Sequence, residues 1–170
     1  MMKKDDLRYK TTYPSPLGEI TLFADGEALT GLYFDGQRTC PSADASQRDD
    51  LSVFVLTKAW LDLFFAGERP LFLPPLQPDG TVFQLRVWDA LTSVPYGRTL
   101  TYGALASALG SSPRAVGQAV GKNPISLLIP CHRVVGADGS LTGYAGGVDR
   151  KAYLLRLERE GVSSVVVRGV

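Results

Sequence analysis

The sequence predicts a two-domain α/β protein: a small N-terminal antiparallel sheet with one helix, then a mostly helical C-terminal domain with a helix-turn-helix. Three observations support this prediction. Short β-rich segments occupy the first third, a proline-rich stretch covers residues 70–82, and helical periodicity dominates afterwards. A chain of 170 residues can form one ordinary domain or two small ones. We place the boundary in the proline-rich stretch, which gives domains of residues 1–78 and 79–170.

Three short strands are predicted in the first domain. The segments that alternate or are rich in β-branched and aromatic residues are 8–13, 19–24 and 29–34. Turn residues separate them at Pro14–Gly18, Asp25–Gly26 and Asp35–Gly36. Turns this short join neighbouring antiparallel strands, so a three-stranded antiparallel sheet is expected, followed by a polar loop at 36–48.

One amphipathic helix should complete this domain. Residues 49–66 carry apolar side chains near a helical period, with Asp49 or Asp50 as a candidate cap and Gly67 as a candidate end. Aromatic residues such as Trp60 are expected in the core. No side chain in this half indicates catalysis.

The second domain should begin with three helices. Apolar spacing predicts them at residues 81–93, 102–109 and 114–121, with Thr101 as an N-cap and Pro113 opening the third. Two short helices joined by a Gly-containing turn indicate a helix-turn-helix, whose second helix enters a nucleic-acid groove.

The second helix of this unit is unusually rich in small residues: Ala115, Gly117, Ala119 and Gly121. Small residues permit close approach either to a groove or to another helix, and the sequence favours neither. Arg114, at the start of this helix, either reaches a partner or is a solvated surface residue.

Charge is unevenly distributed although the net charge is only +1. Residues 1–81 hold 8 Lys/Arg and 12 Asp/Glu, whereas residues 82–170 hold 10 and 5. A basic second half indicates a polyanionic partner for that half, although chance alone explains a difference of this size equally well. The charged start at Met1–Asp6 lacks a following apolar segment, and no run is long enough to span a bilayer. We therefore expect a cytoplasmic protein, or a nuclear one in a eukaryote.

Two cysteines, Cys40 and Cys131, are too few for a disulfide framework. With one histidine, they also lack the spacing of a zinc site. Cys40 lies in a polar run and is interpreted as an incidental loop residue.

The segment Ile129–Val134 contains the only histidine, His132, directly after Cys131. A thiol becomes an effective nucleophile as a thiolate, and an imidazole can take its proton directly or through one water. Pro130 stiffens the backbone before the cysteine. Taken alone a Cys-His pair is weak support for catalysis, because neighbouring side chains often point to opposite faces.

The segments around this pair add further candidates. A buried apolar run at 125–129 leads into it, and a Gly-rich loop at 137–147, containing Tyr144, follows; such a loop can approach a flat ligand closely. Asp149 should cap a last helix over residues 150–160. Glu158 on that helix either orients His132, as in a catalytic triad, or is an exposed helix charge; the sequence alone favours the exposed charge.

In residues 81–161 the chain resembles the 6-O-methylguanine-DNA alkyltransferases (methylated-DNA–protein-cysteine methyltransferases). The matching blocks occur in the family's order: Gly80–Thr81 with Phe83–Gln84 and Val87–Trp88, Val94–Gly97 with Thr99, Thr101–Gly103 with Leu105–Ala106, Arg114–Gly117, Asn123–Pro124, Ile129–Val134 and Gly143–Gly147. The turn Ser15–Gly18 and its strands are similar to the family's first domain.

The resemblance implies a role for each candidate residue. Cys131 would accept the alkyl group, His132 (through a water) and Glu158 would generate and hold the thiolate, and Asn123 would brace the turn. Tyr102 would donate a proton to the guanine, and Arg114 would fill the gap left by a flipped nucleotide. The remaining substrate and DNA contacts would come from Ala115, Gly117, Arg133, Tyr144, Ala145, Gly146 and Lys151.

The resemblance also implies the reaction and the partner. The partner would be double-stranded DNA containing 6-O-alkylguanine, or alkylated thymine, bound through the minor groove by a monomer without cofactor or metal. A thioether has no easy return path, so one protein would repair one lesion. Base flipping costs a few kcal/mol and would expose the alkyl group to the thiol. A small-residue helix suits minor-groove binding without base readout.

Three other hypotheses remain for comparison. A lesion binder without transfer activity would carry another residue at position 131. A Cys-His hydrolase would need a separate oxyanion hole and would turn over a small ester. A transcriptional regulator would explain the helix-turn-helix but not the Pro-Cys-His-Arg segment.

Overall fold

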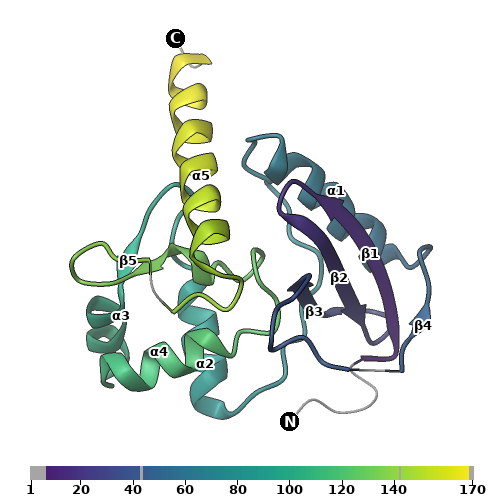
Figure 1. Ribbon diagram of the computed structural model, residues 1–170, viewed down its shortest axis with the longest axis horizontal. Coiled ribbons are helices and arrows are strands. Elements are labelled where there is room, and N and C mark those ends of the chain that lie inside the picture. The colour runs from purple at the N-terminus through teal and green to yellow at the C-terminus, as the bar shows by residue number, and fades with distance from the viewer. Residues whose placement is uncertain (1–6, 43, 142, 169–170) are drawn as a thin grey trace.

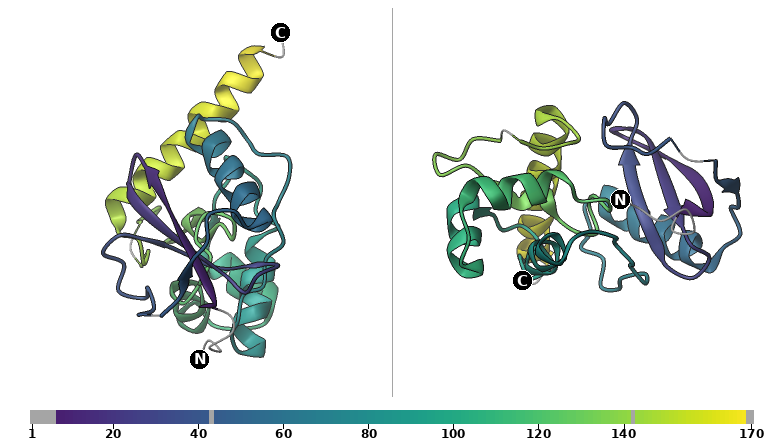
Figure 2. Two further views of the ribbon diagram at one scale, coloured as in Figure 1. Left: turned by 90° about the vertical axis from the view of Figure 1, so that its right-hand side faces the viewer. Right: turned by 90° about the horizontal axis from the view of Figure 1, so that it is seen from below.

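A computed structural model describes residues 7–42, 44–141 and 143–168, with side chains through Gly161. The chain forms two lobes that lie side by side, a sheet lobe from the first half and a helical lobe from the second (Figures 1 and 2). This confirms the predicted fold class. Among the described residues, no helix is long and apolar enough to cross a membrane.

The sheet of the first lobe has the strand order β3-β2-β1-β4. Its antiparallel strands are β1 (Tyr9–Ser15), β2 (Gly18–Ala24) and β3 (Leu29–Phe34). These agree with the predicted strands to within a few residues at the ends. The fourth strand, β4 (Ser46–Gln47), pairs parallel to β1 and lies where a polar loop was predicted. Two residues carry no periodic signal, which explains why the sequence did not show it.

Helix α1 (Ser52–Phe65) packs on the sheet, but neither predicted aspartate caps it. Leu51 occupies the N-cap position without a side-chain hydrogen bond. Asp49 instead accepts a 2.6 Å hydrogen bond from Thr11 of β1, and Asp50 pairs with Arg48 at 2.8 Å. The predicted cap was therefore wrong, because these carboxylates have partners outside the helix. Gly67 follows the helix end with a φ of +82°, as the prediction required.

The helices of the second lobe are α2 (Val82–Leu91), α3 (Tyr102–Leu109), α4 (Pro113–Gly121) and α5 (Val148–Arg168). Thr81 and Gln84 form a reciprocal capping box on α2. The Thr101 hydroxyl accepts from the Ala104 N–H at 3.0 Å, which confirms the predicted cap of α3.

The helix-turn-helix is formed by α3 and α4, which pack against each other. Gly110, with a φ of +63°, ends the first helix, and Ser112 caps the second. Pro113 occupies the first turn of α4, as predicted. The Trp88 indole N–H donates to the Ala119 carbonyl at 2.8 Å and thereby fixes α4 on α2.

A two-stranded parallel sheet of β5 (Leu100–Thr101) and β6 (Val134–Val135) was not predicted. It joins the segment before α3 to the segment directly after a short 3-10 helix, η2 (Cys131–Arg133). This pairing brings Cys131 close to the first residue of α3, Tyr102, although 28 residues separate them in the sequence.

Helix α5 begins earlier and extends further than predicted. It starts at Val148, so Asp149 lies in its first turn and does not cap it. Of its predicted inward residues, Leu154 is fully buried, whereas Tyr153 and Leu157 are half-buried. The helix projects from the helical lobe past the end of α1 (Figure 1).

One hydrophobic core crosses both lobes. It includes Phe34 of β3, Phe54 of α1, Trp88 of α2 and Leu105 of α3. The sheet also continues toward the second lobe, because the Leu32 N–H donates to the Pro124 carbonyl at 2.9 Å. The edge strand β3 therefore abuts the turn that precedes Cys131.

Candidate active site

A braced turn holds the backbone before Cys131. The Asn123 side chain is buried; its amide donates to the Ile129 carbonyl at 2.8 Å and its oxygen accepts from the Ile125 N–H at 3.0 Å. Within the turn, Leu127 has a φ of +73°, which is uncommon for a residue other than glycine. Asn123 thus closes a turn whose backbone is constrained, and Pro130 and Cys131 follow directly.

Cys131 is almost fully buried, with 4% of its surface exposed. Burial raises the pKa of its thiol, since a thiolate loses its hydration there. Hydrogen bonds from Asn123 and Ser126 and the positive charge of Lys151 oppose this effect in part. The net direction is upward, so the thiol is protonated at neutral pH and its reaction requires a proton acceptor.

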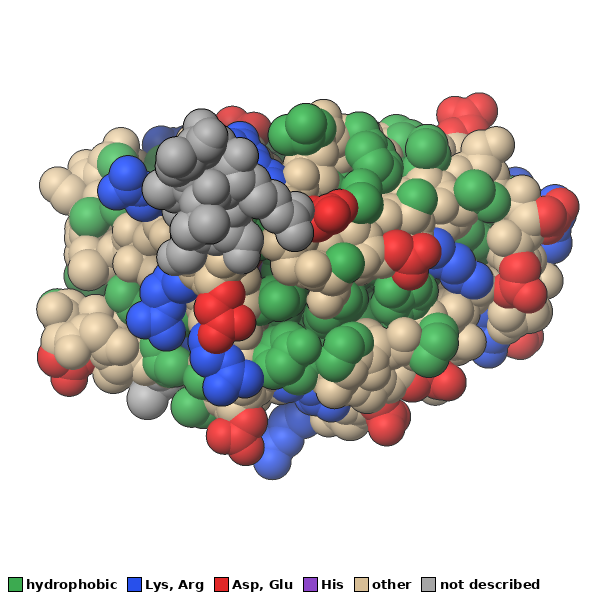
Figure 3. All heavy atoms as spheres, turned by 90° about the horizontal axis from the view of Figure 1, so that it is seen from above, with side chains coloured by type: hydrophobic (Ala, Val, Ile, Leu, Met, Phe, Trp, Pro, Cys, Tyr) green, Lys and Arg blue, Asp and Glu red, His purple; other side chains and the backbone are tan. Residues whose placement is uncertain are grey.

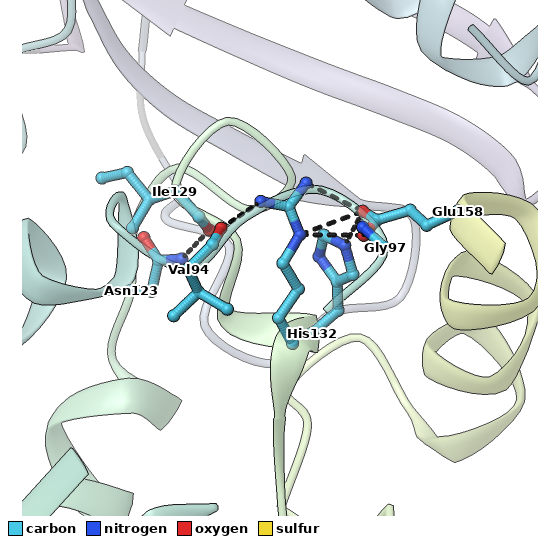
Figure 4. A network of polar contacts seen from close by, with 7 residues as sticks. Val94, Gly97, Asn123, Ile129, His132 and Glu158 are labelled. Carbon is cyan, nitrogen blue, oxygen red and sulfur yellow. Dashed lines mark hydrogen bonds and ion pairs between the residues drawn. The ribbon is translucent and has the colours of Figure 1, made fainter. Parts of the chain in front are cut away.

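His132, Arg133 and Glu158 are buried and form a polar network. Figure 4 shows His132 and Glu158 of this network close together. The His132 Nε2 lies 2.5 Å from a Glu158 oxygen, and the Arg133 Nε and Nη2 donate to the same carboxylate at 2.8 and 3.0 Å. The Gly97 N–H donates to Glu158 at 3.1 Å. The carboxylate is thus held by two side chains and one backbone group.

Burial alone raises the pKa of Glu158, but the hydrogen bonds and charges of His132 and Arg133 more than reverse this and lower it to about 2. The same burial lowers the pKa of the His132 imidazole, which Glu158 only partly offsets. At pH 7 the network therefore holds an ionised carboxylate next to a neutral imidazole.

Glu158 and Arg133 are both buried, whereas the sequence analysis favoured an exposed Glu158 and placed Arg133 at the DNA. Glu158 is 1% exposed, so its interpretation as an exposed helix charge was wrong. Arg133, expected at the DNA, is 8% exposed; besides Glu158 it donates to the Val94 carbonyl at 2.8 Å and lies 5.7 Å from the centre of the Tyr96 ring.

The second nitrogen of the imidazole, His132 Nδ1, is buried and has no hydrogen-bond partner among the described residues. A buried polar atom without a partner is costly and rare, and a catalytic role is one explanation for it. Because Nε2 faces Glu158, Nδ1 is the nitrogen left to accept a proton.

Tyr102, Tyr144 and Lys151 surround the thiol. Burial, and secondarily the charge of Cys131, raises the pKa of the Tyr102 and Tyr144 hydroxyls. Lys151 is fully buried; its ammonium donates to the Val134 carbonyl and lies 5.8 and 6.0 Å from the centres of the Tyr102 and Tyr144 rings. Burial lowers the pKa of Lys151, and Cys131 opposes this.

A cavity of about 540 Å³ lies over the Gly-rich loop. Its lining includes Tyr144, Ala145 and Gly146 from the loop, together with residues 36–39 of the sheet lobe and Arg150 of α5. Neither Cys131 nor Tyr102 is among the residues that line this cavity. Gly143, with a φ of +88°, lies where an added Cβ would be 3.3 Å from the Tyr102 hydroxyl.

The remaining predicted residues lie on α4. Arg114 is exposed, whereas Ala115 and Gly117 are half-buried. A Cβ added at Gly117 would lie 3.9 Å from the Tyr102 ring, while Ala119 is buried under α2. Helix packing accounts for Ala119, whereas an alanine at position 117 would make only an ordinary contact with the tyrosine.

The sequence analysis missed one contributor, Arg150, and gave Ser126 no role toward the thiol. Ser126 faces the thiolate and lowers its pKa, and Arg150 joins the Gly-rich loop to the sheet lobe. The neighbouring sequence indicates neither role. Ser126 meets the thiol only in the folded turn, and Arg150 finds its partners only where the two lobes meet. Among the described residues, no group of three His, Cys, Asp or Glu could hold a metal ion.

Comparison with known proteins places this geometry in a family. Residues 8–78 match the 6-O-methylguanine DNA methyltransferase ribonuclease-like domain, and residues 82–160 match the 6-O-methylguanine DNA methyltransferase DNA binding domain. A methylated-DNA–protein-cysteine methyltransferase of Haemophilus influenzae is 43% identical over 154 residues, covering 89% of this chain and 86% of the relative. Its counterpart in Methanosarcina acetivorans is 43% identical over 152 residues, covering 88% and 97%.

Solved structures with a similar fold support the same family assignment. The crystal structure of Mycobacterium tuberculosis OGT in complex with DNA superposes with a TM-score of 0.83 at 42% identity, covering 90% of this chain and 94% of that one. The M. tuberculosis O6-methylguanine methyltransferase gives 0.81 at 44% identity, covering 89% and 93%. This chain belongs to the 6-O-methylguanine DNA methyltransferase family.

Proposed function

We propose that this protein repairs DNA by transferring the alkyl group of a 6-O-alkylguanine irreversibly to the sulfur of Cys131. The observation that carries the proposal is a buried thiol whose next residue along the chain carries a buried, neutral imidazole. Glu158 holds the imidazole Nε2, and Nδ1 has no hydrogen-bond partner among the described residues, so it would take the thiol proton. Residues 1–78 would form one domain, and residues 79–170 would form the domain for DNA binding and alkyl acceptance.

The reaction balances without a cofactor. The sulfur attacks the alkyl carbon, the carbon–oxygen bond breaks, and its electron pair leaves with the guanine oxygen. The thiol proton passes to His132, directly or through one water, and the guanine gains a proton from Tyr102. The imidazolium then gives up its proton and the phenolate regains one, through solvent. The products are a thioether on Cys131 and an unmodified guanine, so each protein molecule reacts once.

Tyr102 would supply the proton to the guanine. Burial keeps its hydroxyl protonated, and the hydroxyl lies against Gly143 of the Gly-rich loop. Tyr144, Ala145 and Gly146 of the Gly-rich loop would bind the flipped base. Lys151 would favour the thiolate through its charge, because both groups are buried in the same place.

Duplex DNA would bind at α3 and α4, with Arg114 entering the minor groove and filling the gap left by the flipped nucleotide. Arg114 is exposed at the start of α4, and Lys122 is exposed just after its end. The end of the molecule away from these helices shows Lys/Arg and Asp/Glu side chains interspersed (Figure 3), as expected for a face without a polyanionic partner. Arg133 would then orient Glu158 and not touch DNA.

The test is mass spectrometry after mixing the protein with a duplex that carries one 6-O-methylguanine. The peptide containing Cys131 should gain the mass of one methylene group, in at most a one-to-one ratio. Cys131→Ser should abolish the gain and keep DNA binding. A protein that binds the duplex with unchanged mass would instead be a lesion binder.

A further inference from the structure

Arg150, in the first turns of α5, contacts three separate segments through backbone carbonyls. Its Nε donates to Leu17 at 3.1 Å, its Nη1 to Gly146 at 3.1 Å and its Nη2 to Asp35 at 3.0 Å. Leu17 lies in the β1–β2 turn and Asp35 directly follows β3, whereas Gly146 belongs to the loop that lines the cavity. One guanidinium therefore connects the sheet lobe to the Gly-rich loop.

The guanidinium is held in one orientation. Its carbon lies 5.0 Å from the centre of the Phe34 ring, and Phe34 is 1% exposed. Stacking on an aromatic face and a fork of fixed N–H donors suit arginine and not lysine. All three acceptors are neutral carbonyls, so the geometry of the fork and not charge pairing determines these contacts.

Gly146 is packed tightly between the rings of Tyr144 and Phe34. A Cβ added there would lie 2.6 Å from the Tyr144 ring and 3.1 Å from the Phe34 ring. The Gly146 peptide thus has Tyr144 and Phe34 against its Cα, and Arg150 bound to its carbonyl. The orientation of this peptide, and of the Tyr144 ring beside it, depends on the sheet lobe through Arg150.

We propose that Arg150 is a positioning residue that fixes the Gly143–Gly147 loop against the N-terminal lobe and thereby sets the affinity of the pocket for the alkylated base. The inference rests on the proposed function for the identity of the ligand. It gives the N-terminal lobe, which contains none of the proposed reacting groups, a direct part in base binding.

The experiment compares Arg150→Ala and Arg150→Lys with the wild type. Arg156→Ala is the matched control, because it removes the same charge from an exposed position on the same helix. Saturation kinetics with the free base 6-O-benzylguanine separate the apparent dissociation constant from the limiting rate. The pH midpoint of Cys131 alkylation by iodoacetamide reports on the thiol, and thermal unfolding reports on stability.

Arg150→Ala should raise the apparent dissociation constant about tenfold, or about 1.4 kcal/mol, with the limiting rate within about twofold and the iodoacetamide midpoint unchanged. Arg150→Lys should behave like Arg150→Ala, because an ammonium cannot form the three-way fork. If Arg150→Ala does not fold, Arg150→Lys, which keeps the aliphatic stem and the charge, decides the question.

Three results would overturn the inference: an Arg150→Ala affinity equal to that of Arg156→Ala, an Arg150→Lys affinity equal to the wild type, or a shifted iodoacetamide midpoint. Failure of the proposed function is distinguishable, since the wild type would then gain no benzyl mass on Cys131. Calorimetric affinities for the same base would in that case still compare the Arg150 variants.

Discussion

Replacing Glu158 by glutamine should cost this protein about 3 kcal/mol of stability at pH 7. Its carboxyl has a pKa of about 2 in place of the usual 4.5, and each tenfold change in proton affinity corresponds to about 1.4 kcal/mol. Part of this shift requires an imidazolium at His132, which is neutral at pH 7, so the full shift sets an upper bound at that pH. An amide of the same shape mimics the protonated acid and leaves the Arg133 guanidinium buried without its counter-charge. Removing one partner of a buried pair costs about 3–5 kcal/mol, which agrees.

Urea unfolding at pH 7 is the assay. With a denaturant slope of about 2 kcal/mol/M, the midpoint should fall by about 1.5 M. Glu160→Gln is the matched control, because it makes the same change at an exposed position two residues away and should shift the midpoint by less than about 0.3 M.

The sign of the pH dependence gives a second check. A carboxyl with a lowered pKa stabilises the folded protein fully above about pH 4.5, and this stabilisation is lost as the pH falls toward 2. In a ¹³C-labelled sample, the Glu158 carboxyl resonance should not titrate between pH 7 and pH 4. A Glu158 carboxyl that titrates near 4.5, or a Glu158→Gln midpoint equal to that of Glu160→Gln, would refute the reasoning.

Three further predictions concern the reaction. Arg114→Ala should slow repair of duplex DNA at least tenfold while leaving the reaction with a free alkylated base unchanged; equal slowing of both would exclude a role in base flipping. The transfer rate should stay constant from pH 8 down to about pH 6.5 and fall only below it, because burial lowers the pKa of His132 and keeps it neutral; a single-turnover pH profile that already falls above pH 7 would contradict this. Lys151→Met should raise the pKa of Cys131 further, since the positive charge of Lys151 lowers that pKa. An unchanged pH midpoint for iodoacetamide alkylation would show that Lys151 does not act on the thiol.

Local signals explain most of what the sequence predicted correctly. The strand positions, the Thr101 cap and the Pro113 start depend on residues within a few positions of each other. The strands β4, β5 and β6 were missed because each has two residues and pairs with a distant segment. The Asp49 cap failed for the same reason, since Thr11, 38 residues away, binds that carboxylate.

In the candidate site, too, local sequence identified some residues, whereas the roles of others depend on contacts between distant segments. Cys131 and His132 stood out because of their residue types. The helical pattern around Glu158, in contrast, did not show that its carboxylate would be buried. Its carboxylate is buried because η2 and the segment at Gly97 supply donors to it, and these segments meet only in the folded chain. The family resemblance identified Glu158 as a candidate, but it did not show that Arg133 binds the Glu158 carboxylate.

The network also explains why a buried charge pair is retained where apolar side chains would cost less. A buried carboxyl on its own has a raised pKa, and a protonated Glu158 could not stabilise an imidazolium at His132. The hydrogen bonds of His132 and Arg133 and the charge of Arg133 reverse this and keep the carboxylate ionised before any proton arrives. When the thiol proton reaches the imidazole, the new positive charge lies 2.5 Å from a negative charge that is already in place. The stability invested in Arg133 and Glu158 thus lowers the cost of forming a thiolate in a site where burial opposes it.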